Sequence, residues 1–205
     1  MPPDLVSPVP VQSSLIYPLR SIVERLALTE LFPECQPLEV ELGSGDGSFI
    51  VEWARRHPEK NFLAVERLLG RLRKVDRKGQ RAGLTNLRAI RIEAAYCLEY
   101  LLPAESVNVL HVYFPDPWPK RKHRRHRLVN EHFTEVAKQV LAPGGVIYLR
   151  TDDADYFAQI TAVFGANASF QTVAAAKDLE EMLTDFEREF HARGVATLRA
   201  AYRAQ

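Results

Sequence analysis

From about residue 38 onward, short apolar runs typical of buried strands alternate with segments whose apolar residues recur at helical spacing. The expected strands are 38–42, 62–66, 87–92, 107–114, 146–150, 170–174 and 195–203. The expected helices are 48–57, 68–82, 128–141, 154–164 and 179–192. Strands that alternate with helices of this length imply right-handed βαβ units and an open, mostly parallel sheet. The pattern therefore predicts an α/β fold.

The chain length and the first residues set the expected domain organisation. A chain of 205 residues is enough for one α/β domain with a sizeable core, which we place at residues 15–205. Residues 1–14 contain four prolines and little apolar periodicity, so we expect a flexible N-terminal arm.

Composition is that of a soluble globular protein, with 46% apolar and 26% charged residues. No apolar run approaches the roughly 20 residues of a membrane span, and the N-terminus lacks a basic-then-apolar signal pattern. We therefore expect a cytoplasmic protein that does not interact with membranes. Cys35 and Cys97 form no metal-ligand spacing and are interpreted as reduced thiols.

A glycine-rich segment, residues 43–47 (GSGDG), follows the first expected strand and leads into a helix. Glycines are needed where a loop turns sharply and a ligand approaches bare backbone. The dinucleotide pattern G-x-G-x-x-G would place its third glycine at position 48, which is Ser48. Glu41, two residues before Gly43, would repel a pyrophosphate but suits a ligand with a cationic end. S-adenosylmethionine has a sulfonium, an ammonium and no phosphate, so we expect it to contact Glu41, Gly43 and Gly45. The alternative is an ordinary glycine-rich turn.

Two further carboxylates follow the next expected strands. Glu66 ends the second strand, where it can accept hydrogen bonds from ribose hydroxyls. Glu93 follows the third strand, where a carboxylate can accept from the 6-amino group of adenine; a solvated loop acid is the alternative. Because ligands of such sheets bind beyond the carboxyl ends of the strands, we expect both acids to contact the same cofactor.

The expected fourth strand ends in residues 114–120, FPDPWPK. Its three prolines fix the backbone and hold the carboxylate of Asp116 at the strand edge. A rigid turn with a packed Trp118 is the alternative, but such a turn has no need for an acid at the ligand-facing end of a strand. Asp116 is therefore a candidate functional residue.

Charge is unevenly distributed, although the net charge is only +1. Residues 120–127 hold six Lys or Arg and two His, whereas residues 178–189 hold six acids and one Arg. Such a run is usually a solvated face. Here it adjoins Trp118 and combines stacking with phosphate neutralisation, as nucleic-acid sites require. The expected phosphate contacts are Arg121, Arg124, Arg125 and Arg127.

The segment FPDPWPKRKHRRHRL (114–128) resembles the signature of the bacterial tRNA (guanine-N7)-methyltransferases, which modify a guanine in the variable loop. Similarity continues through Thr151-Asp152 and through TDFEREF (184–190), and it covers roughly residues 38–203. The resemblance implies a class I methyltransferase with a doubly wound, Rossmann-like sheet whose last strand is antiparallel. It also implies S-adenosylmethionine as methyl donor, no metal, tRNA as substrate, and no obligatory protein partner.

The resemblance assigns roles to individual residues. The implied cofactor contacts are Glu41, Glu66, Glu93 and Asp116, and Asp116 is also the implied catalytic residue. The implied substrate contacts are Lys120, Asp152, Thr184 and Glu187. Without the resemblance, residues 184–187 are typical of a helix capping box and Asp152 of a helix N-cap. The sequence departs from the family pattern at Glu93, where Asp is usual, and at Lys122 and His126, where Arg is common.

The chemistry of guanine agrees with this interpretation. N7 has an in-plane lone pair and no proton, so methyl transfer requires alignment and no general base. The product is a cationic purine, whose developing charge a carboxylate at Asp116 can stabilise. Asp152 or Glu187 could accept from the donors on the Watson–Crick edge of guanine. Two alternatives stay open: a methyltransferase for exocyclic amines, whose sites typically show D/N-P-P-Y/F/W, and a non-catalytic RNA-binding module of the same fold.

Overall fold

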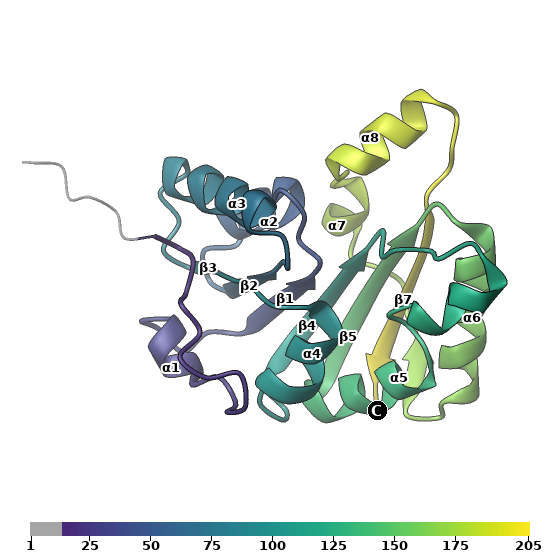
Figure 1. The fold of residues 1–205 in the computed structure, drawn as a ribbon, viewed down its shortest axis with the longest axis horizontal. Helices are drawn as coiled ribbons and strands as arrows, with labels where there is room; N and C mark the ends of the chain where they lie inside the picture. Colours follow the sequence, from purple (N-terminus) through teal and green to yellow (C-terminus); the bar gives the residue numbers. More distant parts are fainter. Residues whose placement is uncertain (1–13) are drawn as a thin grey trace, which may run out of the picture.

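The computed structural model describes residues 14–205 and contains a seven-stranded mixed sheet (Figure 1). The strands are β1 (Leu38–Leu42), β2 (Asn61–Val65), β3 (Leu87–Ile90), β4 (Val107–Tyr113), β5 (Leu141–Thr151), β6 (Phe170–Thr172) and β7 (Leu198–Ala204). Their order is β3-β2-β1-β4-β5-β7-β6. The first five strands are parallel, and β7 is antiparallel to both β5 and β6. The predicted α/β fold with an antiparallel last strand is confirmed, whereas the predicted arm, except Ser14, lies outside the described residues.

Helices pack on both faces of this sheet. They are α1 (Leu28–Leu31), α2 (Ser48–Arg56), α3 (Leu69–Arg81), α4 (Ala94–Tyr96), η1 (Cys97–Leu101), η2 (Arg121–His126), α5 (Glu131–Val140), α6 (Ala154–Ala166), α7 (Lys177–Glu181) and α8 (Asp185–Ala192). Buried residues of α1, η1, α5 and α6 form one core, and those of α2, α3 and α7 form a second core. All residues of β1 and β2 are buried, as expected for parallel strands covered on both sides.

Three expected elements differ from the structure. The expected helix 128–141 begins only at Glu131, because the Asn130 side chain caps α5 by accepting from the Phe133 amide at 3.0 Å; the basic segment before it forms a separate 3-10 helix, η2. The strand expected at 146–150 starts at Leu141, so the Pro-Gly-Gly sequence lies inside β5. The helix expected at 179–192 is two helices, because Thr184 caps a new one.

The carboxyl ends of the parallel strands meet at one edge of the sheet, and α8 lies above the ends of β4 and β5 (Figure 1). The amide nitrogen of Asp185, the first residue of α8, lies 3.5 Å from the Ser48 hydroxyl at the start of α2. The helix thus reaches from the glycine-rich loop to the end of β4. Among residues 14–205, the structure has no helix whose length and apolar character would let it span a membrane.

Candidate active site

The glycine-rich loop turns directly from β1 into α2. Gly43, Gly45 and Gly47 all have positive φ angles, 85°, 56° and 79°. A Cβ atom at Gly43 or Gly45 would meet nothing within 4 Å, whereas one at Gly47 would lie 2.9 Å from a methyl carbon of Val75. Gly47 therefore serves the packing of α2 against α3. The other two glycines leave an open backbone surface that a ligand can approach.

Glu41 is buried beneath this loop without a full set of partners. Only 4% of the residue is exposed, and its Oε2 atom has no hydrogen-bond partner among residues 14–205. The buried hydroxyl of Ser44 likewise has no partner in that part of the chain. Burial raises the pKa of Glu41 to about 8; Arg150 opposes this effect, whereas the acids Asp46 and Glu66 add to it. Such a carboxyl group lacks a cationic partner.

Glu66 at the end of β2 is held by the same loop. Its Oε2 accepts a hydrogen bond from the Gly45 amide at 3.0 Å, and its Oε1 accepts from the Leu68 amide at 2.7 Å. These bonds fix the carboxylate, and each oxygen keeps a lone pair for a further donor.

A cavity of about 320 Å³ lies beside these residues at the carboxyl edge of the sheet. The predicted site residues that line it are Gly43, Glu66, Glu93 and Asp116. Phe114, Trp118 and His126 also line it. Four residues predicted from separate parts of the chain thus share one cavity, which is the candidate cofactor site.

Glu93, which lines this cavity, also caps a helix. Its Oε2 accepts a hydrogen bond from the Tyr96 amide at 2.9 Å, so the residue caps the short helix α4. Its other oxygen is free to accept from a ligand as far as the hydrogen bonds of residues 14–205 show. The contact between Glu93 and adenine stays a prediction.

The turn after β4 holds Asp116 in the wall of the cavity. Phe114 and Trp118 have positive φ angles of 50° and 45°, which side chains other than glycine adopt rarely. The Phe114 amide donates to the Arg150 carbonyl at 2.8 Å, which ties this turn to β5. A strained turn that places an exposed carboxylate in a cavity is typical of a functional site.

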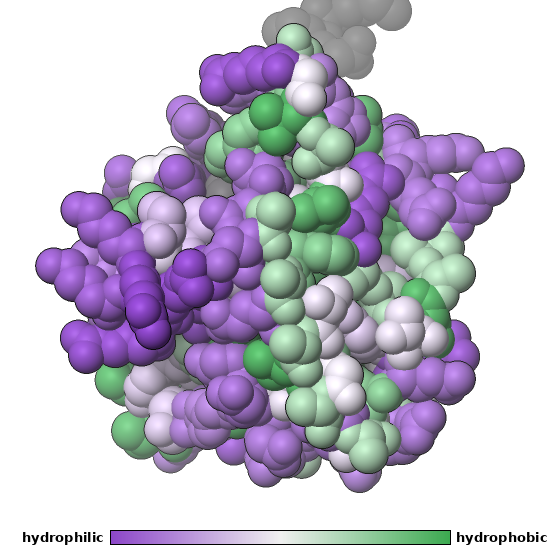
Figure 2. Space-filling view, turned by 90° about the vertical axis from the view of Figure 1, so that its right-hand side faces the viewer, coloured by the Kyte–Doolittle hydropathy of each residue, from purple (hydrophilic) through white to green (hydrophobic). Residues whose placement is uncertain are grey.

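The basic segment, residues 120–127, divides into exposed and buried cations. Lys120, Arg121, Arg124 and Arg125 are exposed, and Arg124 forms an ion pair of 2.9 Å with Asp155 of α6. Figure 2 views the end of the molecule where α6 lies and shows hydrophilic side chains gathered beside an apolar band. Lys120, Arg121, Arg124 and Arg125 are therefore open to solvent.

Arg127 contradicts the expectation that it contacts phosphate. Only 2% of it is exposed, and its guanidinium donates to the Pro117 carbonyl at 2.7 Å, to Gln159 at 2.9 Å and to Asp155 at 2.6 Å. The guanidinium also lies 4.7 Å from the ring centroid of Tyr156. Arg127 thus anchors the proline-rich turn to α6.

Thr184 and Glu187 are predicted substrate contacts, but both are buried within the protein. The Thr184 hydroxyl accepts from the Glu187 amide at 3.1 Å, and Glu187 Oε2 accepts from the Thr184 amide at 2.8 Å, which completes a capping box. Glu187 is 0% exposed and pairs with Arg150 at 2.7 Å and Arg199 at 2.8 Å. Both carboxylate oxygens already have protein donors, so the geometry makes Glu187 the residue that fixes α8.

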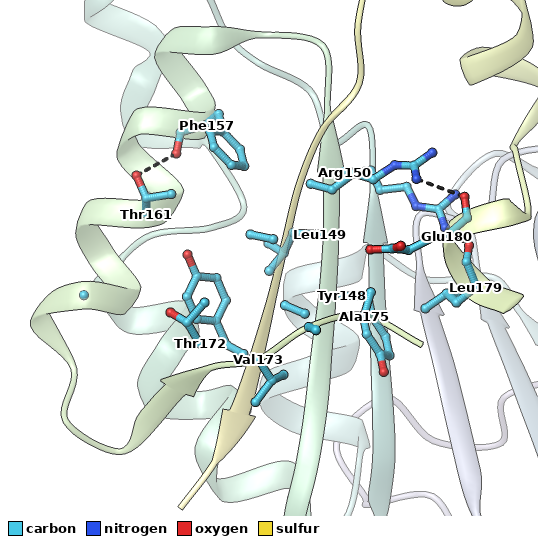
Figure 3. A pocket seen from close by; sticks show the side chains of 16 residues that line it. Tyr148, Leu149, Arg150, Phe157, Thr161, Thr172, Val173, Ala175, Leu179 and Glu180 are labelled. Carbon is cyan, nitrogen blue, oxygen red and sulfur yellow. Dashed lines mark hydrogen bonds between the residues drawn. The ribbon is translucent and has the colours of Figure 1, made fainter. Parts of the chain in front are cut away.

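A second cavity, of about 400 Å³, lies on the other side of this anchor, between α6, β7 and residues 172–180 (Figure 3). None of the predicted site residues lines it. Arg150 donates to the carbonyl of Leu179 at 2.6 Å and to that of Met182 at 2.7 Å, and Arg199 donates to the carbonyl of Glu180 at 2.9 Å. These arginines attach α7 and α8 to the sheet.

Lys120 and Asp152 are exposed at the carboxyl edge, and neither lines a cavity described above.

The sequence interpretation missed a buried network behind the site. Glu39 Oε2 lies 2.8 Å from His111 Nε2 and accepts from the Trp53 indole at 2.8 Å, while its Oε1 accepts from Lys60 at 2.8 Å. The other nitrogen of His111 lies 2.7 Å from the Tyr113 hydroxyl. The signal was a second glutamate in the strand LEVEL, on the same face as Glu41.

The fold is that of the class I methyltransferases. A solved 16S rRNA methyltransferase, KamB, superimposes with a TM-score of 0.65 at 16% identity, covering 89% of this chain and 95% of that chain. TrmN from Thermus thermophilus gives a TM-score of 0.60 at 18% identity, covering 87% of this chain and 47% of that chain. At these identities the likeness shows the fold alone.

Sequence comparison identifies the family. Residues 35–204 match the model of a family described as putative methyltransferase. The tRNA (guanine-N7)-methyltransferase of Syntrophotalea carbinolica is 36% identical over 168 residues, which cover 80% of this chain and 72% of that protein. The corresponding protein of Aliivibrio fischeri is 33% identical over 186 residues, which cover 84% of this chain and 75% of that protein. The chain belongs to the tRNA (guanine-N7)-methyltransferase family, and its fold and family imply S-adenosylmethionine as methyl donor.

Proposed function

We propose that this protein transfers the methyl group of S-adenosylmethionine to N7 of a guanine in the variable loop of tRNA. The observation that carries the proposal is the buried Glu41 carboxyl group, which lacks a partner beside a cavity lined by Glu66, Glu93 and Asp116. An acidic, glycine-lined site fits a cofactor with two cationic groups and no phosphate. The family membership indicates guanosine as the nucleoside and N7 as the methylated atom.

The residues present fit this cofactor in three parts. Glu41 and the open backbone at Gly43 and Gly45 suit the cationic end, because the carboxyl group lacks a donor and a Cβ atom at either glycine would meet nothing within 4 Å. Glu66, fixed by two loop amides, would accept from the ribose hydroxyls. Glu93 would accept from the adenine amino group with the oxygen that does not cap α4. Among residues 14–205, no cluster of His, Cys, Asp and Glu could hold a metal ion.

Bound S-adenosylmethionine supplies an electrophilic methyl group on a sulfonium centre. The protein then has to orient the guanine so that N7 lies in line with that methyl group, and N7 needs no base because it carries no proton. We assign Asp116 to stabilise the positive charge that grows on the purine, because the prolines hold its carboxylate in the cavity wall. Lys120 and the exposed arginines of η2 would bind phosphates beside this turn, and Asp152 would accept from guanine donors.

The product nucleoside tests the proposed function. Wild-type protein incubated with labelled S-adenosylmethionine and bulk tRNA is expected to yield 7-methylguanosine, whose fixed charge makes the reduced strand sensitive to aniline. Asp116→Asn keeps the side-chain shape and removes the charge, so it should lower kcat by about 100-fold with little change in tRNA affinity.

Three outcomes would contradict parts of this account. A labelled exocyclic amine without aniline-sensitive breaks would favour the rival methyltransferase. No transfer to any tRNA, with the cofactor bound, would favour the non-catalytic module. Turnover of the Asn variant close to wild type would leave the N7 product standing and remove the electrostatic role of Asp116.

A further inference from the structure

Every exposed side chain of helix α3 carries a positive charge. Leu72, Val75 and Gly79 are buried, so the helix packs one face against the core. Arg67, two residues before the helix, is exposed as well. We define the α3 basic surface as Arg67 together with the exposed cations of the helix, which are Arg71, Arg73, Lys74, Arg77 and Arg81.

Acidic side chains do not balance this surface. Residues 67–81 contain one acid, Asp76, whose carboxylate accepts from the Leu15 amide at 2.7 Å. The ion pair of this segment in the described part of the chain joins Lys78 to Asp46 at 2.8 Å and involves no member of the α3 basic surface. The surface is therefore a row of cations without acidic partners among the residues that the structure describes.

The neighbouring helix α2 shows how an ordinary solvated face is built. Glu52 pairs there with Arg55 and with Arg56, both at 2.8 Å. On α3, in contrast, Arg73 and Arg77 lie one turn apart with no acid between them, and like charges at this spacing destabilise a helix. A helix that keeps this repulsion is typical of a surface that binds a polyanion.

The α3 basic surface begins at the candidate cofactor cavity. Arg67 and Arg71 line that cavity, and so does His126, which belongs to the basic segment after β4. From the cavity, the 13 residues of α3 extend for about 20 Å on the side of β2 and β3, whereas α8 lies above the ends of β4 and β5 (Figure 1). The cavity thus joins two separate basic segments of the protein.

The form of the α3 basic surface favours a nucleic-acid backbone as its occupant. A small anion needs a few cations that converge on one point, whereas these cations follow the length of a helix. A helix that binds a membrane surface presents large apolar side chains beside its cations, and no exposed residue of α3 is apolar apart from Gly70. A backbone with a phosphate at every nucleotide matches an extended row of cations.

We propose that the α3 basic surface binds the sugar–phosphate backbone of the tRNA, at nucleotides other than those that contact residues 120–127. The proposal rests on the proposed function, because it takes tRNA as the polyanion. It implies that the substrate is held on both sides of the cavity, with the target guanine between the two contacts. The resemblance gave helix α3 no role in substrate binding.

A charge-removal variant of α3 tests this contact by tRNA binding across a range of salt concentrations. The double variant Arg73→Gln/Arg77→Gln should weaken tRNA binding by about 10- to 60-fold in about 0.1 M salt. The slope of log K against log salt should flatten by about 1.4 to 1.8 units, because each neutralised phosphate contributes about 0.7 to 0.9. The affinity for S-adenosylmethionine should not change, since neither arginine lines the cavity.

Two matched double variants serve as controls. Arg73→Lys/Arg77→Lys keeps both charges and should keep the slope of the wild type. Arg55→Gln/Arg56→Gln removes the same charge from α2, where Glu52 already neutralises it, and should also leave the slope unchanged. The melting temperature of Arg73→Gln/Arg77→Gln should equal or exceed that of the wild type, because the substitution relieves repulsion between like charges.

The possible outcomes separate this proposal from its alternatives. Wild-type affinity and slope in Arg73→Gln/Arg77→Gln would overturn it, and so would an equal loss in the α2 control, which would show an effect of net charge alone. Loss of binding to vesicles of anionic phospholipid, with tRNA binding unchanged, would assign the surface to a membrane instead. Because binding is measured without methyl transfer, a wild-type protein that forms no 7-methylguanosine would contradict the proposed function, while tRNA binding that still depends on Arg73 and Arg77 would support the contact.

Discussion

Strand β1 carries two buried carboxyl groups, those of Glu39 and Glu41, on the same face but in different surroundings. Glu39 has a donor for each oxygen, from Lys60 on one side and from Trp53 and His111 on the other. Glu41, two residues later, has an oxygen with no partner in the described chain. Burial acts to raise the pKa of both groups, but the bonds of Glu39 to His111 and Lys60 lower its pKa to about 2, whereas the pKa of Glu41 rises to about 8.

This difference separates a structural acid, Glu39, from an acid that we propose binds a ligand, Glu41. Leaving a buried carboxyl group without partners costs stability, so a fold that pairs one glutamate and leaves its neighbour unpaired has reserved the second for something else. Because Glu41 lies beside the open glycine-rich loop, we propose that this partner is the cationic end of the cofactor.

The largest expected effect is on stability, at Glu39. Glu39→Ala should lower the free energy of unfolding by about 3–5 kcal/mol, because it leaves buried donors of His111 and Trp53 unpaired. Because the pKa of Glu39 is lowered from 4.5 to about 2, its stabilisation is present above pH 4.5 and is lost as the pH falls towards 2. Urea unfolding at pH 7 and at acid pH measures both. Glu52→Ala is the control, since Glu52 pairs with Arg55 and Arg56 on the surface and should change stability by less than about 1 kcal/mol.

The next effect is on cofactor binding, at Glu41. Glu41→Gln should weaken S-adenosylmethionine binding by about 1.5–3 kcal/mol, the range for a hydrogen bond to a charged group. Its free energy of unfolding at pH 7 should change by less than about 1 kcal/mol, because the amide resembles the protonated carboxyl group already present in the folded protein. Calorimetry and urea unfolding on the same preparation separate the two. A stability loss as large as that of Glu39→Ala, with cofactor affinity retained, would make Glu41 structural as well.

The smallest effect concerns the basic segment, where exposed cations differ from the buried Arg127 as Glu41 differs from the paired Glu39. Replacing Arg124 and Arg125 with Ala should flatten the slope of log K for tRNA against log salt by about 1 to 2 units, because each neutralised phosphate contributes about 0.9. Arg127→Ala should leave that slope unchanged and lower the melting temperature, because its guanidinium is bonded within the protein. Equal slopes in wild type and the double variant would mean that the exposed cations are a solvated face.

Most of the fold follows from apolar periodicity, because strands β1 and β2 are buried at every position and the glycine at 83 ends α3 with a φ of 67°. The boundaries that differ depend on tertiary contacts. Asn130 begins α5 later than the apolar pattern indicates. Pro-Gly-Gly lies inside β5 because β4 pairs with Leu141 and then with Val146, and the residues between them form an irregularity in the pairing.

The grouping of Gly43, Glu66, Glu93 and Asp116 around one cavity was predictable, because each follows or ends a strand and strand ends place side chains at one edge of the sheet. The burial of Arg127 and Glu187 was not predictable from the sequence. Nothing local distinguishes Arg127 from Arg125, and Arg127 is buried only because Asp155 and Gln159 of α6 meet it. The capping box at 184–187 was visible in the sequence, but its two arginine partners come from distant strands.

The central claim is that Glu41 is kept unpaired for a cationic cofactor, and proton release on binding tests it most directly. A group with a pKa near 8 in the free protein must ionise to pair with a cation, so binding should release close to one proton below that pH. The affinity for S-adenosylmethionine should then rise about tenfold per pH unit between pH 5.5 and 7.5, and Glu41→Gln should remove this dependence. Calorimetry in buffers of different ionisation enthalpy counts the protons. A wild-type affinity that does not change across this range, with no proton released, would contradict the account.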